Sequence, residues 1–139
     1  MEPAPVDLLQ LTRSLVDIDS TTGREAPAGR WLSRYLQELG FDVLEQPVDE
    51  HRFNLLATSK TPHVLLSTHF DCVPPFFPSR LEGDRIYGRG ACDAKGIIAA
   101  QIAAVDRLRR EGEARERRRS GGQRPVEQLP IHRGRRTYL

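Results

Sequence analysis

The chain has 139 residues, which favours a single domain, and it is 38% hydrophobic and 29% charged with a formal net charge of +2. The charge is uneven, because residues 1–106 hold 10 basic and 15 acidic side chains whereas residues 107–139 hold 11 arginines and 4 glutamates. Two cysteines exclude a disulfide framework and a zinc site made of paired Cys-x-x-Cys motifs. With no secretory signal in view and no apolar run near about 18 residues, we expect a cytoplasmic protein without a membrane span.

Two amphipathic helices are predicted before residue 41. The first has an apolar face made of Leu8, Leu11, Leu15 and Ile18. The second has a longer apolar face made of Ala28, Trp31, Leu32, Tyr35, Leu36 and Leu39. Residues Thr22 to Glu25 match a capping box at the start of the second helix, and Gly40 is expected to end it in a left-handed conformation.

Three strands are predicted next, at residues 41–48, 53–58 and 64–68. The third is expected to be the most buried, because a continuous apolar run is typical of a strand that is covered on both faces. Residues 81–87 are expected to form a short edge segment around a Gly-Asp turn. A helix that begins at Lys95 is apolar on most sides until Asp106, which predicts that it is buried.

The regular pattern ends near Glu113. Beyond it the chain has an Arg-rich run, a Ser-Gly-Gly link and two prolines, without a helical or strand period. We therefore predict an α/β fold for residues 1–113, with a partial sheet and flanking helices, and a disordered basic tail over residues 114–139.

Candidate site residues stand where the third predicted strand ends and where the last helix begins. His69 and Asp71 follow the apolar run, and Asp93 lies in the glycine-rich segment 88–96. Open α/β sheets bind their ligands at such strand ends. Residues two apart in an extended chain point the same way, so His69 can be a metal ligand that Asp71 orients. A carboxylate such as that of Asp93 can bridge two metal ions about 3.5–4 Å apart.

The histidine has other interpretations. A lone histidine at a strand end can be a surface residue or one that is simply hydrogen-bonded. A relay of Ser67, His69 and Asp71 is a weaker alternative, because the sequence has no strained Gly-x-Ser-x-Gly turn around the serine.

The glycines and cysteines near the site also have more than one reading. Gly88 and Gly90 resemble the start of a dinucleotide loop, but Asp93 at the third glycine position would repel a pyrophosphate. We expect these glycines to let the backbone pass closely around the site instead. Cys72 and Cys92 could be thiolate ligands, although a free cysteine is more often a small buried hydrophobic residue, and that is the interpretation we prefer.

Two motifs together resemble one known family. They are STHFDCVP at residues 67–74 and GDRIYGRGACDAKG at residues 83–96. In this order and spacing they are similar to the zinc metallopeptidase family of aminoacylases, acetylornithine deacetylases, succinyl-diaminopimelate desuccinylases and glutamate carboxypeptidases. The resemblance covers about residues 6–113 and implies the N-terminal part of a di-zinc exopeptidase-like catalytic domain.

The resemblance implies a role for each candidate residue. His69 would be a terminal ligand of one of two zinc ions, for which cobalt can substitute, and Asp93 would be the bridging carboxylate. Asp71 would be the catalytic residue that holds the histidine and tunes its basicity. A non-proline cis peptide bond is expected at Asp93–Ala94. The implied activity is hydrolysis of amide bonds, as a deacylase or exopeptidase acting on N-acyl amino acids or small peptides.

The resemblance also implies residues that we do not find after Glu113: a strand followed by a Glu-Glu pair, a further acidic ligand, a distal histidine and a lid and dimerisation domain. We therefore expect a truncated or frame-shifted member with impaired activity, and not the homodimer of the family. One alternative is an inactive fragment that binds no metal. Another is binding of nucleic acid or a similar anionic polymer by the Arg-rich tail, which has only Tyr138 for base stacking.

Overall fold

The computed structural model of the chain describes residues 4–59, 61 and 63–120, except for the side chains of residues 114–120. Its helices are α1 (Leu8–Val16), α2 (Ala26–Glu38) and α3 (Lys95–Ser120). Its strands are β1 (Asp42–Pro47), β2 (Phe53–Thr58), β3 (Arg80–Glu82) and β4 (Arg85–Tyr87). Within these residues β1 pairs with β2 and β3 with β4, both antiparallel, so the predicted α/β class with a partial sheet is confirmed.

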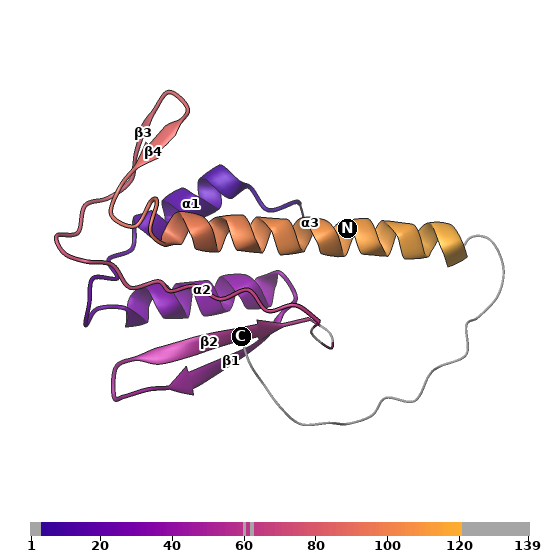
Figure 1. The fold of residues 1–139 in the computed structure, drawn as a ribbon, viewed down its shortest axis with the longest axis horizontal. Helices are drawn as coiled ribbons and strands as arrows, with labels where there is room; N and C mark the ends of the chain where they lie inside the picture. Colours follow the sequence, from indigo (N-terminus) through magenta and orange to yellow (C-terminus); the bar gives the residue numbers. More distant parts are fainter. Residues whose placement is uncertain (1–3, 60, 62, 121–139) are drawn as a thin grey trace.

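The core forms where the three helices meet. The β1–β2 hairpin lies along α2, α1 packs against α3, and the β3–β4 hairpin extends away from the helices (Figure 1). Both predicted apolar faces contribute to this core, although Leu8 at the start of α1 remains 47% exposed. The buried cluster consists of Leu11, Leu15, Leu32, Leu36, Ile98, Ala99 and Ile102.

The predicted capping box at the start of α2 is wrong. Glu25 itself occupies the N-cap position, and its Oε1 accepts a hydrogen bond from the Gly23 N–H at 3.0 Å. The N–H of Thr22, which a capping box would pair with the glutamate, donates instead to the Cys72 carbonyl at 3.1 Å. A contact distant in sequence has therefore taken the donor that the local motif needs.

The end of α2 matches the prediction. Gly40 has a φ of +83°, and its N–H donates to the Gln37 carbonyl at 2.9 Å. The next N–H, from Phe41, reaches back to the Leu36 carbonyl at 3.0 Å. These two bonds make a Schellman motif, which satisfies carbonyls at the helix end and directs the chain into β1.

Residues 64–68, predicted to be the most buried strand, do not form a strand in this structure. Val64, Leu65 and Leu66 are 77%, 51% and 47% exposed. In the described part of the chain, residues 64–69 make no backbone–backbone hydrogen bond. A strand requires a paired neighbour as well as a suitable sequence, and no described residue pairs with this segment.

The last helix starts at Lys95, as predicted, and continues beyond residue 113 to Ser120. Its first turns bury one face, with Ile98, Ala99 and Ile102 in the core, but Ile97 is 44% exposed and Leu108 is 66% exposed. The prediction that most sides of this helix are buried is therefore wrong. Residues 121–139 of the predicted tail lie outside the described residues. Among those that are described, no helix combines the length and apolarity needed to cross a membrane.

Candidate functional site

The structure brings the three predicted site residues together. His69 Nδ1 lies 3.1 Å from Asp71 Oδ1 and also 3.1 Å from the Asp71 carbonyl oxygen. On the other side of the ring, His69 Nε2 lies 3.1 Å from Asp93 Oδ1. The side chains are 52%, 47% and 78% exposed respectively, so a ligand can reach the cluster from solvent.

The segment that carries His69 is held by the connection between α1 and α2. Ser20 Oγ donates to the Phe70 carbonyl at 2.5 Å, and the Cys72 N–H donates to the Ser20 carbonyl at 2.9 Å. Thr21 and Cys72 form an isolated parallel bridge. Cys72 is only 4% exposed, which confirms the expectation that it is a small buried residue. The backbone of residues 70–72 is thus held by residues 20–22, whereas residues 64–69 make no backbone–backbone hydrogen bond within the described chain.

The loop that carries Asp93 passes closely over Cys72. Gly90 has a φ of +86°, and a Cβ atom placed there would lie 2.7 Å from Cys72 Sγ. The absence of a side chain therefore allows the approach that brings Asp93 beside His69. The Asp93–Ala94 peptide bond is cis, as the resemblance implied.

Lys95 is a residue of this loop that sequence reasoning missed. It is completely buried, and its Nζ donates to the Ile18 carbonyl at 2.5 Å, which ties the start of α3 to the segment that follows α1. Burial lowers the pKa of Lys95, against the opposing influence of nearby acidic groups. A lysine in the first turn places its positive charge at the positive end of the helix dipole, which is unfavourable. This unfavourable placement was the signal in the sequence that Lys95 has a specific partner.

The two carboxylates set the protonation of His69. Burial by itself would lower the pKa of this imidazole, but the hydrogen bond to the Asp71 backbone and the negative charges of Asp71 and Asp93 outweigh it and raise the pKa. When both ring nitrogens carry a proton, the ring can donate to Asp71 from Nδ1 and to Asp93 from Nε2. A metal ion at Nε2 would have to displace that proton.

The geometry suits part of a metal site. Two atoms bound at about 2.0–2.1 Å to one tetrahedral zinc lie about 3.3 Å apart, and His69 Nε2 and Asp93 Oδ1 are close to this separation at 3.1 Å. Asp71 meanwhile occupies the place of the carboxylate that orients a ligating histidine. The donor set is incomplete, because the described residues contain no group of three or more His, Cys, Asp or Glu side chains placed to hold a metal. Cys92, expected to be buried, is exposed.

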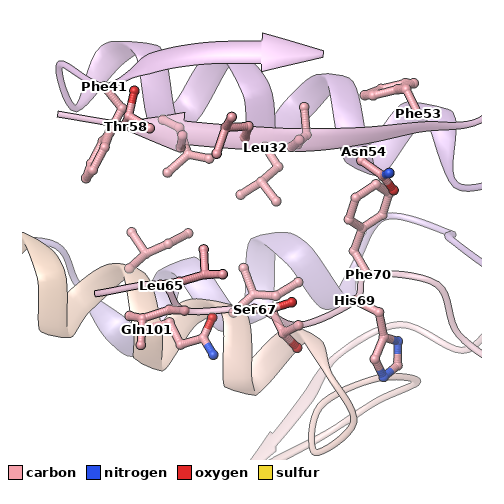
Figure 2. A pocket seen from close by; sticks show the side chains of 18 of the residues that line it. Leu32, Phe41, Phe53, Asn54, Thr58, Leu65, Ser67, His69, Phe70 and Gln101 are labelled. Atoms are coloured by element: carbon pink, nitrogen blue, oxygen red, sulfur yellow. The ribbon is translucent and has the colours of Figure 1, made fainter. Parts of the chain in front are cut away.

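A cavity of about 470 Å³ adjoins the cluster. One wall is β2 with α2 behind it, and the other is the segment from Val64 to Asp71 with α3 behind it (Figure 2). His69 lies at one end of the cavity and Phe41 with Thr58 at the other. Much of the lining is apolar, including Leu32, Leu36, Leu55, Ile98, Ile102 and Val105.

Comparison with known proteins locates this stretch in a family. The peptidase family M20/M25/M40 matches residues 65–118, which include His69, Asp71 and Asp93. A probable carboxypeptidase of Aspergillus terreus is 44% identical over 123 residues, covering 76% of this chain and 28% of that protein. A peptidase M20 domain-containing protein of Schizosaccharomyces pombe is 39% identical over 120 residues, covering 82% and 30%. The chain thus spans less than a third of the length of these curated relatives.

Proposed function

Because this chain belongs to the peptidase family M20/M25/M40, we propose that it serves in metal-dependent hydrolysis of amide bonds. The observation that carries the proposal is the placement of His69 between two carboxylates, with one ring nitrogen toward each. The relatives named as probable carboxypeptidases support a peptidase role. We take the substrate to be an N-acyl amino acid or a small peptide.

We propose zinc as the metal, held by His69 Nε2 and Asp93. Bound zinc would lower the pKa of a water molecule toward about 7 and polarise a scissile carbonyl. The protein's own part is to keep the ligands in place. Asp71 accepts the Nδ1–H of His69, which fixes the tautomer whose Nε2 lone pair is free for the metal. The same hydrogen bond makes Nε2 more basic and so a stronger ligand for the metal.

We also propose that activity is impaired in the chain as it stands. A catalytic zinc uses about three protein ligands and keeps one open position. His69 and Asp93 supply two donors, and the described residues offer no group of three. This observation also favours the second candidate, a fragment that folds but binds no metal.

Zinc titration of the full chain by isothermal calorimetry separates the two candidates. We expect a saturable site that His69→Gln and Asp93→Asn each weaken at least tenfold, because each removes one donor. His51→Gln is the matched control, since His51 is an exposed histidine in the turn before β2. Circular dichroism must show that every variant remains folded.

Two results decide against the proposal. One is a folded chain with no measurable zinc affinity, which favours the inactive fragment. The other is an equal loss of affinity in His51→Gln and His69→Gln, which indicates binding by surface histidines. Hydrolysis of N-acetyl amino acids and dipeptides, with and without a chelator, then measures whether the zinc-loaded chain retains activity.

A further inference from the structure

The two predicted metal ligands cannot hold each other in place once a metal is bound. The side chains of His69 and Asp93 are 52% and 78% exposed, and His69 Nε2 lies 3.1 Å from Asp93 Oδ1. A metal bound to both side chains would replace the proton on Nε2, so the hydrogen bond between them would be lost. The separation of the two ligands must therefore be set by the backbone segments that carry them.

The segment that carries Asp93 is a closed loop continuous with the first turn of α3. The N–H groups of Lys95 and Gly96 both donate to the Gly90 carbonyl, at 2.9 and 3.4 Å. The backbone of Gly96 also lies so close to the Ala91 carbonyl oxygen that an added Cβ would clash with it. Asp93 lies within this loop, so its position depends on how the first turn of α3 is held.

The side chain of Lys95 attaches that turn to residues 18–22, here called the bridge segment. Its Nζ donates to the Ile18 carbonyl at 2.5 Å, and the residue is completely buried. Taking an ammonium group out of water is costly, whereas an apolar side chain of similar length would fill the same space without that cost. The specific contribution of the lysine is therefore its bond to the bridge segment.

The segment that carries His69 is held by the same bridge segment. Ser20 Oγ donates to the Phe70 carbonyl at 2.5 Å, and the Ser20 carbonyl accepts from the Cys72 N–H at 2.9 Å. Ser20 is 1% exposed and Cys72 is 4% exposed, so these bonds are shielded from water. Both exposed ligands are thus attached, through buried hydrogen bonds, to one short stretch of backbone.

We propose that Lys95 is a positioning residue for the metal site, because it fixes the Asp93 loop to the bridge segment that also holds His69. The bridge segment then sets the separation of the two ligands, and Lys95 does not itself touch the metal. This inference rests on the proposed metal-dependent function. The alternative is that Lys95 only stabilises the fold, in which case its loss would lower stability without changing the site.

Lys95→Met tests the proposal, because it keeps an unbranched side chain of similar length and removes the ammonium group. Arg109→Met is the matched control, since Arg109 Nη1 also donates from α3 to a backbone carbonyl, that of Leu39 at 3.0 Å, but not to the bridge segment. In zinc calorimetry of the full chain, we expect Lys95→Met to weaken binding at least about tenfold and Arg109→Met less than about threefold. An unchanged affinity in a folded Lys95→Met, or an equal loss in both variants, overturns the proposal.

A double variant tests whether the effect passes through the bridge segment. Ser20→Ala removes the side-chain bond from the bridge segment to Phe70. If both residues act through the same segment, Lys95→Met with Ser20→Ala should bind zinc no more than about threefold more weakly than the weaker of the two single variants. Effects that multiply overturn the proposal. If Lys95→Met does not fold, Lys95→Gln replaces it under the same criteria, because its shorter amide cannot reach the Ile18 carbonyl without a shift of the backbone.

Crystal structures of the metal-free proteins test the geometry without relying on zinc. In Lys95→Met we expect the separation of His69 Nε2 and Asp93 Oδ1 to increase from 3.1 Å to beyond about 3.5 Å, outside hydrogen-bond reach. In Arg109→Met it should stay at 3.1 Å. A parent chain that binds no zinc contradicts the proposed function but leaves this comparison valid. An unchanged separation in Lys95→Met overturns the inference, whatever the zinc affinity.

Discussion

Substitution of Gly90 by alanine is the sharpest test of how the loop that carries Asp93 is built. Gly90 has a φ of +86°, and an added Cβ would lie 2.7 Å from Cys72 Sγ and 3.1 Å from Lys95 Cδ. Gly23 is a matched control, because its φ is +90° and an added Cβ would meet nothing within 4 Å. The two alanine variants therefore share the backbone cost and differ in the steric contact.

The magnitudes follow from these two contributions. A left-handed conformation costs an L-residue about 1–2 kcal/mol, which is the whole effect expected for Gly23→Ala. Gly90→Ala should cost a further 1–3 kcal/mol or so, because the methyl group overpacks a buried contact. Removing Sγ with Cys72→Ala should relieve most of that second part. The double variant should therefore be more stable than the sum of the two single effects by about 1–3 kcal/mol.

Urea unfolding followed by circular dichroism measures these free energies, provided that the m values of the variants agree. Zinc titration of the same proteins reports whether the displaced loop still holds Asp93 beside His69. Equal destabilisation by Gly90→Ala and Gly23→Ala, within about 0.5 kcal/mol, would show that the contact with Cys72 has no energetic role. So would an unchanged cost of Gly90→Ala in the Cys72→Ala background.

Three further predictions concern the core, acid stability and thiol reactivity. Leu15 is 1% exposed and belongs to the core cluster between the three helices. Leu15→Ala should lower the free energy of unfolding, measured by urea denaturation, by about 2–5 kcal/mol. A loss below about 1 kcal/mol would contradict the described core. Burial would raise the pKa of Asp106, but hydrogen bonds from an arginine and a backbone N–H, with arginine charges, outweigh it and lower that pKa. The contribution of Asp106 to stability is therefore present above its ordinary pKa of about 3.9 and is lost as the pH falls through its lowered pKa in the folded state. The difference in free energy of unfolding between the parent chain and Asp106→Asn should stay constant from pH 7 to 5 and shrink below pH 4. A difference that does not change with pH would contradict this. A thiol reagent should modify the exposed Cys92 at once and the buried Cys72 only on unfolding, and equal rates would show that Cys72 is accessible.

Zinc affinity gives a last prediction, for the residue that orients the ligand. Asp71→Asn should keep the fold and weaken zinc binding about 10–100-fold, because the amide is a poorer acceptor for the Nδ1–H of His69. The affinity is measured by competition with a chromophoric chelator. An unchanged affinity would mean that Asp71 does not support the histidine.

Much of the site could be read from local pattern. His69, Asp71 and Asp93 were predicted to converge, and they do, because the end of an apolar run and the start of a helix are both visible in the sequence. Lys95 was missed, since an unfavourable lysine in the first turn of α3 signals that it has a partner but does not identify that partner as the distant Ile18 carbonyl. The exposure of Cys92 was also missed, because residue type alone does not distinguish this exposed cysteine from the buried Cys72.

The amino-acid sequence alone determined α1, α2, the strands β1 and β2, the turn-centred segment at residues 81–87 and the start of α3. Helical periodicity, turn residues and the glycine at position 40 all act within a few residues. Tertiary structure alone decided the outcome at Thr22, whose N–H is taken by Cys72, and at residues 64–68. That apolar run has the composition of a central strand, yet it pairs with none of the described residues. A strand is completed by a neighbour from elsewhere in the fold, and no local pattern can supply one.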